Sequence, residues 1–212
     1  FFFFFMDQVG LTPSDILVLV GDLLEKGQDS LALLRYVMEL SRTHTVYPLC
    51  GNCDGLVLRF FDTDELDGRF YSAYLPIHPE STIRQLAEEL GFSNWRDFPA
   101  LRAALREAYP EIRAWLRGLP TILETEHLLF VHGGVPSREH METLNRWKCM
   151  KNDNFLGQGH RFDKYVVVGH WPVTLYHPHI PSAAPLFARE QNIISIDGGC
   201  VLKLDGQLNA LI

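Results

Sequence analysis

Several apolar runs of the sequence end in a polar residue that can bind a metal ion. These residues are Asp22, Asn52, His132, His170 and Asp197. A single Gly-Asp or a single His at the end of an apolar run has an ordinary explanation, as a turn or as a core histidine. The repetition of the pattern along the chain is harder to explain in this way. Mixed oxygen and imidazole ligands suit Mn, Fe or Zn better than a soft thiolate site would.

The runs that carry these residues are predicted to be strands. Short unbroken apolar runs are typical of strands buried on both faces, and in open α/β sheets ligands bind beyond the carboxyl ends of the strands. The five residues should therefore meet at one rim. Glycines beside them permit tight turns and close approach of the backbone. The predicted strands are Ile16–Val20, Thr45–Leu49, His127–Val131, Tyr165–Val168 and Asn192–Ile196.

Helical segments alternate with these strands, which indicates an α/β fold. A helix capped by Asp29 or Ser30 is predicted to run to about Arg42. Residues 62–120 differ in composition and are predicted to be a helical insertion, with helices at roughly 81–90, 97–108 and 110–117. A helix should end at Gly10. Asp205-Gly206 predicts a hairpin in the tail. We interpret 6–212 as a single domain and set the Phe run at 1–5 aside as an artefact.

The composition excludes some classes of protein. The chain has 212 residues and a formal net charge of −7, which argues against nucleic acid as the main partner. No window reaches the roughly 18 apolar residues that a membrane span needs, so we expect no membrane partner. Cys50, Cys53, Cys149 and Cys200 lack the spacing of a secreted disulfide scaffold, which favours a reducing, cytoplasmic setting.

The polar residues and their neighbours resemble the sequence blocks of the calcineurin-like metallophosphoesterases, and most closely those of bacterial serine/threonine protein phosphatase-like proteins. Gly21-Asp22 through Gly27 resembles the block G-D-x-x-D-R-G, and Gly51-Asn52-Cys53-Asp54 resembles G-N-H-D or G-N-H-E. His132-Gly133-Gly134 resembles H-G-G, Gly169-His170 resembles G-H, and Asp197-Gly198-Gly199 resembles the closing D-x-G. The blocks occur in the family's order and cover nearly the whole chain from Met6.

The resemblance implies a metallophosphoesterase-type α/β/β/α sandwich with a helical insertion and a site for two divalent metal ions (Mn, Fe or Zn). Asp22 would bridge the two ions, and Asn52, His132 and His170 would hold the second. Two such ions activate a hydroxide and clamp the attacked phosphate. The family opens with a strand ending in D-x-H, which supplies the first metal. No such block occurs in this sequence, so one site is expected to be incomplete.

Two blocks depart from the family. Cys53 replaces the His that protonates the leaving group, and a thiol, with an ordinary pKa near 8.5, is a weaker acid than imidazolium. Asp54 either orients residue 53 or caps a loop. Lys26 replaces the phosphate-binding Arg, and a lysine binds phosphate as a point charge without the bidentate fork. Glu25 replaces an Asp.

Two further features have a chemical and a structural interpretation. Arg146, together with Lys148 and Lys151, either meets substrate phosphate or forms a solvated basic helix face. Cys50 and Cys53 form a C-x-x-C. We expect Cys53 to lie in a metal-site loop and not at a helix N-terminus, so the redox interpretation is disfavoured. Phe155, Trp171 and Tyr176 are expected to be rim or core aromatics. His160, His177 and His179 are left out of the ligand set.

These residues predict a metal-dependent phosphatase that hydrolyses phosphate monoesters, in a phosphoprotein or a small phosphoester, by a two-metal-activated hydroxide. A dinucleoside polyphosphate hydrolase would share the blocks, but it would need more basic residues around the pocket. A degenerate phosphatase fold that only binds a partner is the non-enzymatic alternative. Lys26, Cys53 and the missing D-x-H favour that alternative, whereas the retained metal-binding residues oppose it.

Overall fold

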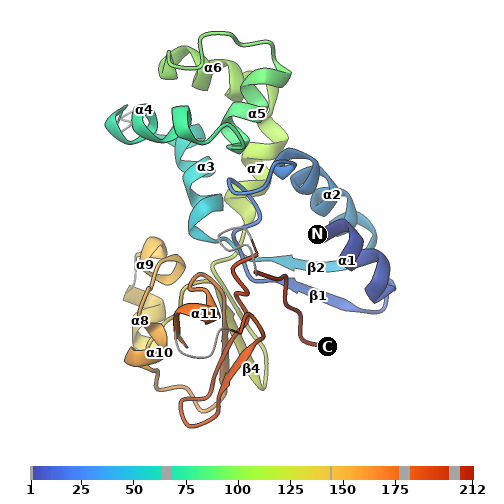
Figure 1. Cartoon of the computed structure of the whole chain (residues 1–212), viewed down its shortest axis with the longest axis vertical. Helices are drawn as coiled ribbons and strands as arrows, with labels where there is room; N and C mark the ends of the chain where they lie inside the picture. The colour runs from blue at the N-terminus through green and yellow to red at the C-terminus, as the bar shows by residue number, and fades with distance from the viewer. Residues whose placement is uncertain (1, 64–67, 144, 177–181, 201–205) are drawn as a thin grey trace. The chain divides into compact units, whose positions relative to one another are not determined.

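A computed structural model describes residues 2–63, 68–143, 145–176, 182–200 and 206–212. The chain divides into two compact units (Figure 1). The first, which we call the sheet unit, comprises Phe1–Asp22, Thr43–Asn52 and Pro120–Ile212. The second, the helical unit, comprises Leu23–Arg42 and Cys53–Leu119. Among the described residues, no helix combines the length and the apolar character needed to cross a bilayer.

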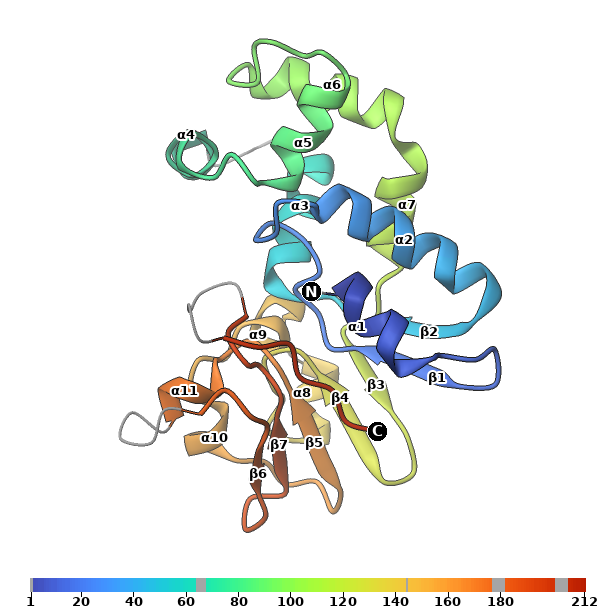
Figure 2. The same ribbon diagram turned by 45° about the vertical axis from the view of Figure 1, so that its right-hand side comes forward.

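The sheet unit contains two sheets. β1 (Ile16–Leu19) pairs in parallel with β2 (Thr45–Pro48). The larger sheet has the order β3-β4-β5-β7-β6, which can be followed in Figure 2. Its central strands β4, β5 and β7 are parallel, and both edge strands are antiparallel to their neighbours. The carboxyl ends of the three central strands therefore lie at the same edge of the sheet. The bounds are β3 Ile122–Glu124, β4 Leu128–Val131, β5 Tyr165–Val168, β6 Leu186–Ala188 and β7 Ile193–Ser195.

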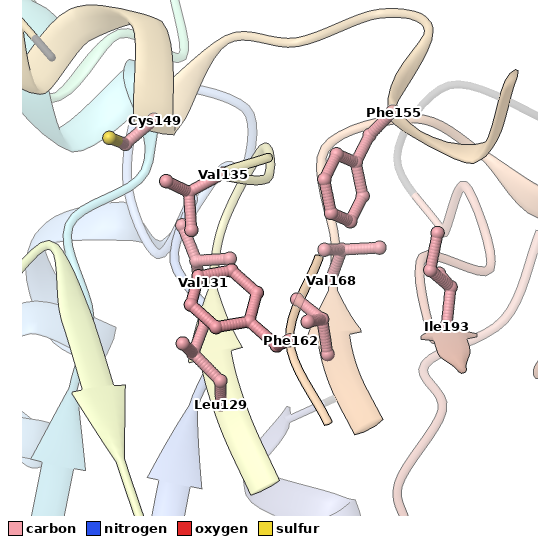
Figure 3. Packing of buried hydrophobic residues seen from close by; sticks show 9 residues of the cluster. Leu129, Val131, Val135, Cys149, Phe155, Phe162, Val168 and Ile193 are labelled. Atoms are coloured by element: carbon pink, nitrogen blue, oxygen red, sulfur yellow. The ribbon is translucent and has the colours of Figure 1, made fainter. Parts of the chain in front are cut away.

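One face of the larger sheet is covered by short helices. Alternate residues of the strands, such as Leu129 and Val131 in β4, point towards this face because side chains of a strand alternate in direction. Cys149 and Phe155, from the helices, pack against them, as Figure 3 shows. This packing holds both ends of the segment between the helix that contains Cys149 and the helix that begins at Phe155. The helices of the sheet unit are α1 Phe2–Val9, α8 Arg138–Thr143, α9 Arg146–Met150, α10 Phe155–Gln158 and α11 Val173–Tyr176.

The helical unit buries one apolar stripe from each of its main helices. Leu101 and Leu105 are fully buried in α6, one helical turn apart. The carboxylate of Asp97 accepts a hydrogen bond from the amide of Ala100 and so caps the start of this helix. The helices of the unit are α2 Ser30–Thr43, α3 Asn52–Asp62, α4 Gly68–Ile77, α5 Thr82–Glu89, α6 Phe98–Ala108 and α7 Pro110–Gly118, where Asn52 itself belongs to the sheet unit.

The mixed α/β architecture confirms the predicted fold class. All the predicted strands are present within a residue of their expected bounds, and so are the helices predicted between 81 and 117. The sequence did not lead us to predict α3, α4 or the three-residue edge strands β3 and β6. Such short strands give too few residues for an alternating pattern. The predicted tail hairpin includes Asp205, which lies outside the described residues. Phe2–Phe5 form the first part of α1, and Gly10 follows this helix with a φ of 64°.

Candidate metal centre

Three side chains of the sheet unit converge after the ends of three strands. Asp22 follows β1, His132 follows β4 and His170 follows β5. Each offers one ligand atom, and these atoms lie within 4.8 Å of one another. The rings of His132 and His170 are packed edge to face, with centroids 5.3 Å apart. The structure therefore brings together three of the four residues expected to bind metal, from positions far apart in the sequence.

The orientation of His132 is set by the backbone. Its Nδ1 lies 2.7 Å from the carbonyl oxygen of Val20, which can only accept a hydrogen bond, so Nδ1 carries the hydrogen. In a neutral ring Nε2 then has a lone pair, and Nε2 lies 3.2 Å from Oδ1 of Asp22. A lone pair and a carboxylate oxygen at this distance need a cation between them, either a proton or a metal ion. The His132 side chain is only 2% exposed.

His170 is held on an unusual backbone. Its φ is 64°, and Asp22 has a φ of 55°, in the left-handed region that residues other than glycine rarely adopt. Such strained conformations cluster at functional sites. The Nε2 of His170 lies 2.7 Å from Oδ1 of Asp153. Burial lowers the pKa of His170, although the hydrogen bond to Asp153 opposes the shift. The lowered pKa favours the neutral ring that can donate a lone pair to a metal ion.

Two glycines allow the chain to pass close to this centre. Gly21 has a φ of 88°, and a β-carbon there would lie 2.7 Å from the amide nitrogen of Gly51. A β-carbon at Gly51 would overlap the carboxylate and the backbone nitrogen of Asp22. Both positions are therefore restricted to glycine by contact, and the first also by its backbone conformation.

Asn52 and Asp197 complete the set expected at this rim. Asn52 follows Gly51 directly and begins α3, so its place in the chain puts it next to the Asp22 loop. Asp197 follows β7, and its Oδ1 accepts a hydrogen bond of 2.8 Å from the amide of Gly199. Burial raises the pKa of Asp197, although the hydrogen bond from the amide of Gly199 opposes the shift. Asp197 is not one of the three side chains whose ligand atoms lie within 4.8 Å of one another.

These residues fit a divalent metal ion. The donor set combines a carboxylate with two imidazoles, and both rings have one nitrogen committed to an acceptor on the protein. This leaves the other nitrogen as a lone-pair donor, an arrangement that is usual for histidine ligands. Asp22, His132 and His170 would hold the ion, and Asn52 could add an amide oxygen.

The expectation that Cys53 lies in a loop is wrong. Cys53 is the second residue of α3 and so lies in the first turn of a helix. The apolar residues Val57, Phe60 and Phe61 follow at helical spacing and are fully buried, a signal in the sequence that predicts this helix. Cys53 is only 3% exposed and, like Cys50, has a buried side chain.

Asp54 acts as an anchor within the helical unit. Its Oδ1 accepts hydrogen bonds from the amides of Leu23 and Leu24, at 3.0 and 3.1 Å. These contacts match the loop-capping interpretation of Asp54. The buried carboxylate thus holds the segment that follows Asp22 in the chain.

Glu25 is a buried carboxylate whose structural role was not anticipated. It is 0% exposed, and it accepts hydrogen bonds from the hydroxyls of Tyr74 and Ser81 and from the amide of Thr82. Burial raises the pKa of Glu25 despite these bonds. The next residue, Lys26, places its Nζ 5.9 Å from the centre of the Tyr74 ring. Glu25 therefore fixes the Lys26 loop to α4 and α5.

The other predicted candidates occupy varied positions. Arg146 begins α9 and is partly buried, whereas Lys148 and Lys151 are exposed.

The Nε2 of His160 lies 3.0 Å from the carbonyl oxygen of Asn192, which gives this ring a structural role. Phe155 is a core residue, as expected, whereas His177 and His179 lie outside the described residues. Asp153 was missed because no sequence block carries it.

Comparison with known proteins assigns the chain to a family. A search of curated proteins gave no match. A family model described as calcineurin-like phosphoesterase matches residues 5–194, which is most of the chain and includes the strands that carry Asp22, His132 and His170. The chain therefore belongs to the calcineurin-like phosphoesterases, a family of metal-dependent hydrolases of phosphoric esters.

Proposed function

We propose that this protein is a phosphatase that hydrolyses phosphate monoesters, in a phosphoprotein or a small phosphoester, with two divalent metal ions such as manganese. The observation that carries the proposal is the convergence of Asp22, His132 and His170 within 4.8 Å. A site that had lost its function would have no need to keep two strained ligand positions and two oriented imidazoles. We place the protein in a reducing, cytoplasmic compartment, because its four cysteines lack the spacing of a secreted disulfide scaffold.

Asp22, Asn52, His132 and His170 are proposed as the residues that would hold the metal. When bound, the ions supply Lewis acidity that activates water and offsets the charge of the phosphate. The protein's own part is to fix the ligand atoms. The Val20 carbonyl does this for His132, and the close contact between Gly51 and the Asp22 loop does it for Asp22.

Cys53 is proposed to donate the proton that the leaving group needs, with Asp54 as its catalytic partner. The order of the chain supports this assignment, because Cys53 directly follows Asn52, which is proposed to hold metal. The Asp54 carboxylate accepts hydrogen bonds from the amides of Leu23 and Leu24 and so holds the segment that follows Asp22. A thiol gives up its proton less readily than imidazolium, so activated esters should be better substrates than alkyl phosphates.

Lys26 and Arg146 are proposed to bind the phosphate group. Lys26 is partly exposed and lies on a loop that the buried Glu25 fixes in place. Arg146 is partly buried at the start of α9. A lysine binds phosphate as a compact charge, whereas an arginine adds a planar fork of donors. The phosphorylated substrate is the only partner that the proposal requires.

The test is to measure bound metal by elemental analysis, together with turnover of p-nitrophenyl phosphate in added Mn²⁺. We expect metal in the wild-type protein and turnover that His132→Ala abolishes. The protein could bind metal and cleave a dinucleoside polyphosphate but no monoester. That outcome would identify dinucleoside polyphosphates, and not monoesters, as the substrate class. A protein that shows no bound metal and no turnover would contradict the proposal. That result would favour a degenerate fold that binds a partner.

A further inference from the structure

The two histidines of the metal centre are oriented in different ways. His132 is held by a backbone carbonyl, that of Val20. His170 is held by a side chain, because its Nε2 lies 2.7 Å from Oδ1 of Asp153. A backbone carbonyl cannot be removed by substitution, whereas a carboxylate can. Asp153 is therefore a position at which the orientation of one ligand can be tested directly.

Asp153 is held firmly although it is itself half exposed. It lies between α9 and α10, and its side chain is 49% exposed, whereas that of His170 is only 7% exposed. The carbonyl oxygen of Cys149, at the end of α9, accepts hydrogen bonds from the amides of Gly133 and Gly134, which follow His132. On the other side, Phe155 packs in the core of the sheet unit. The segment that carries Asp153 is thus tied to the loop that follows His132.

A hydrogen bond to one imidazole nitrogen decides what the other nitrogen can do. A carboxylate accepts the bond, so the Nε2 of His170 carries the hydrogen and Nδ1 keeps its lone pair. The bond also restrains rotation of the ring about its side-chain torsions. Lys151 places its Nζ 3.2 Å from the same Oδ1 of Asp153, so the two side chains form an ion pair beside His170.

We propose that Asp153 is a positioning residue that presents Nδ1 of His170 to the metal ion. Lys151 is the ion-pair partner of Asp153. The inference rests on the proposed function, because it requires that Asp22, His132 and His170 bind metal. Carboxylates that orient a histidine ligand in this way contribute about 10- to 100-fold to metal affinity or activity in other sites.

The test is calorimetric titration of the metal-free full chain with Mn²⁺. We expect Asp153→Ala to weaken Mn²⁺ binding by about 10- to 100-fold. Asp153→Asn should lose less Mn²⁺ affinity than Asp153→Ala, because the amide oxygen of asparagine can still accept the hydrogen bond from Nε2 of His170. Asp163→Ala is a matched control, since it removes an exposed aspartate from the same unit, and it should bind Mn²⁺ like the wild type.

A second measurement separates positioning from a general structural effect. The absorption spectrum of the Co²⁺-loaded protein reports the geometry around the ion, so Asp153→Ala should shift its visible bands while the melting temperature of the metal-free protein stays unchanged. Wild-type affinity and spectrum in Asp153→Ala would overturn the inference, and so would an Asn variant as impaired as the Ala variant. A wild-type protein that binds no Mn²⁺ would instead overturn the proposed function, and the inference with it.

Discussion

At the scale of single residues, Gly51 controls the position of Asp22. The Gly51→Ala variant should bind Mn²⁺ at least about 10-fold more weakly, because the new β-carbon would displace the Asp22 carboxylate and errors of about 1 Å are costly in such sites. Calorimetric titration with Mn²⁺ would measure the loss. Gly118→Ala is the control, since a β-carbon there meets nothing within 4 Å. Equal affinities in the two variants would contradict the placement of Asp22 in the site.

Cys53 offers a second test at this scale, because the family resemblance predicts a histidine at its position. The Cys53→His variant should raise turnover of an alkyl phosphate, relative to p-nitrophenyl phosphate, by up to about 100-fold, since only the poor leaving group needs a strong proton donor. Steady-state kinetics on both esters would give the ratio. The larger ring enters a buried position and should cost about 1–3 kcal/mol of stability.

The ratio of the two turnover rates separates the loss of stability in Cys53→His from its effect on proton donation, because loss of folded protein lowers both rates equally. Cys53→Ser, which changes the volume little, should leave turnover of the activated ester nearly unchanged. If the ratio of rates is the same in the wild type and in Cys53→His, residue 53 does not supply the proton.

At the scale of elements, the edge strand β3 is tied to the sheet unit by a charged cluster. Glu124 in β3 accepts hydrogen bonds from Arg138 in α8, and it lies 2.9 Å from Nζ of Lys164, which precedes β5. The hydrogen bonds from Arg138 and Lys164 lower the pKa of Glu124 to about 2, from an ordinary value of 4.5. The exposure of Arg138 screens the interaction, so the effect on stability should be modest.

The direction of its pH dependence follows from the pKa. Because the folded-state pKa lies below the unfolded one, the ionised Glu124 stabilises the fold above about pH 5, and this contribution is lost as the pH falls towards about 2. Glu124→Gln should therefore melt at a lower temperature near neutral pH, and the difference from the wild type should shrink on acidification. Melting curves over this pH range would test the expectation, with Glu126→Gln as an exposed control. A difference that grows on acidification would contradict it.

At the scale of the whole molecule, the residues that converge on the metal centre all belong to the sheet unit. A ligand that binds only the folded protein stabilises it by about 2.7 kcal/mol at a hundred times its dissociation constant. Added Mn²⁺ should therefore slow hydrogen exchange most in the loops after β1, β4 and β5, and much less in α5, α6 and α7. Exchange measured by mass spectrometry would show this pattern, and His132→Ala should remove it. Equal slowing throughout the chain would contradict a site confined to these loops.

The sequence by itself determined the strands that carry the site and the residues at their ends. Local information suffices for both, because an unbroken apolar run marks a buried strand and a Gly-Asp or Gly-His pair marks its end. It also determined the helices between residues 81 and 117, whose apolar residues recur at helical spacing. The family followed from the order of these blocks. Helix α3 could have been predicted in the same way, since Val57, Phe60 and Phe61 recur at helical spacing.

Only the tertiary structure decided how the site residues are held. His132 meets the carbonyl of Val20, 112 residues away, and His170 meets Asp153, 17 residues away. Glu25 is buried by contacts with residues 49 to 57 positions further along the chain. No local pattern records such pairings, because they depend on which loops the parallel strands bring to one edge. The physical reason is that propensity and periodicity act within an element, whereas hydrogen bonds between side chains require that the elements have already packed.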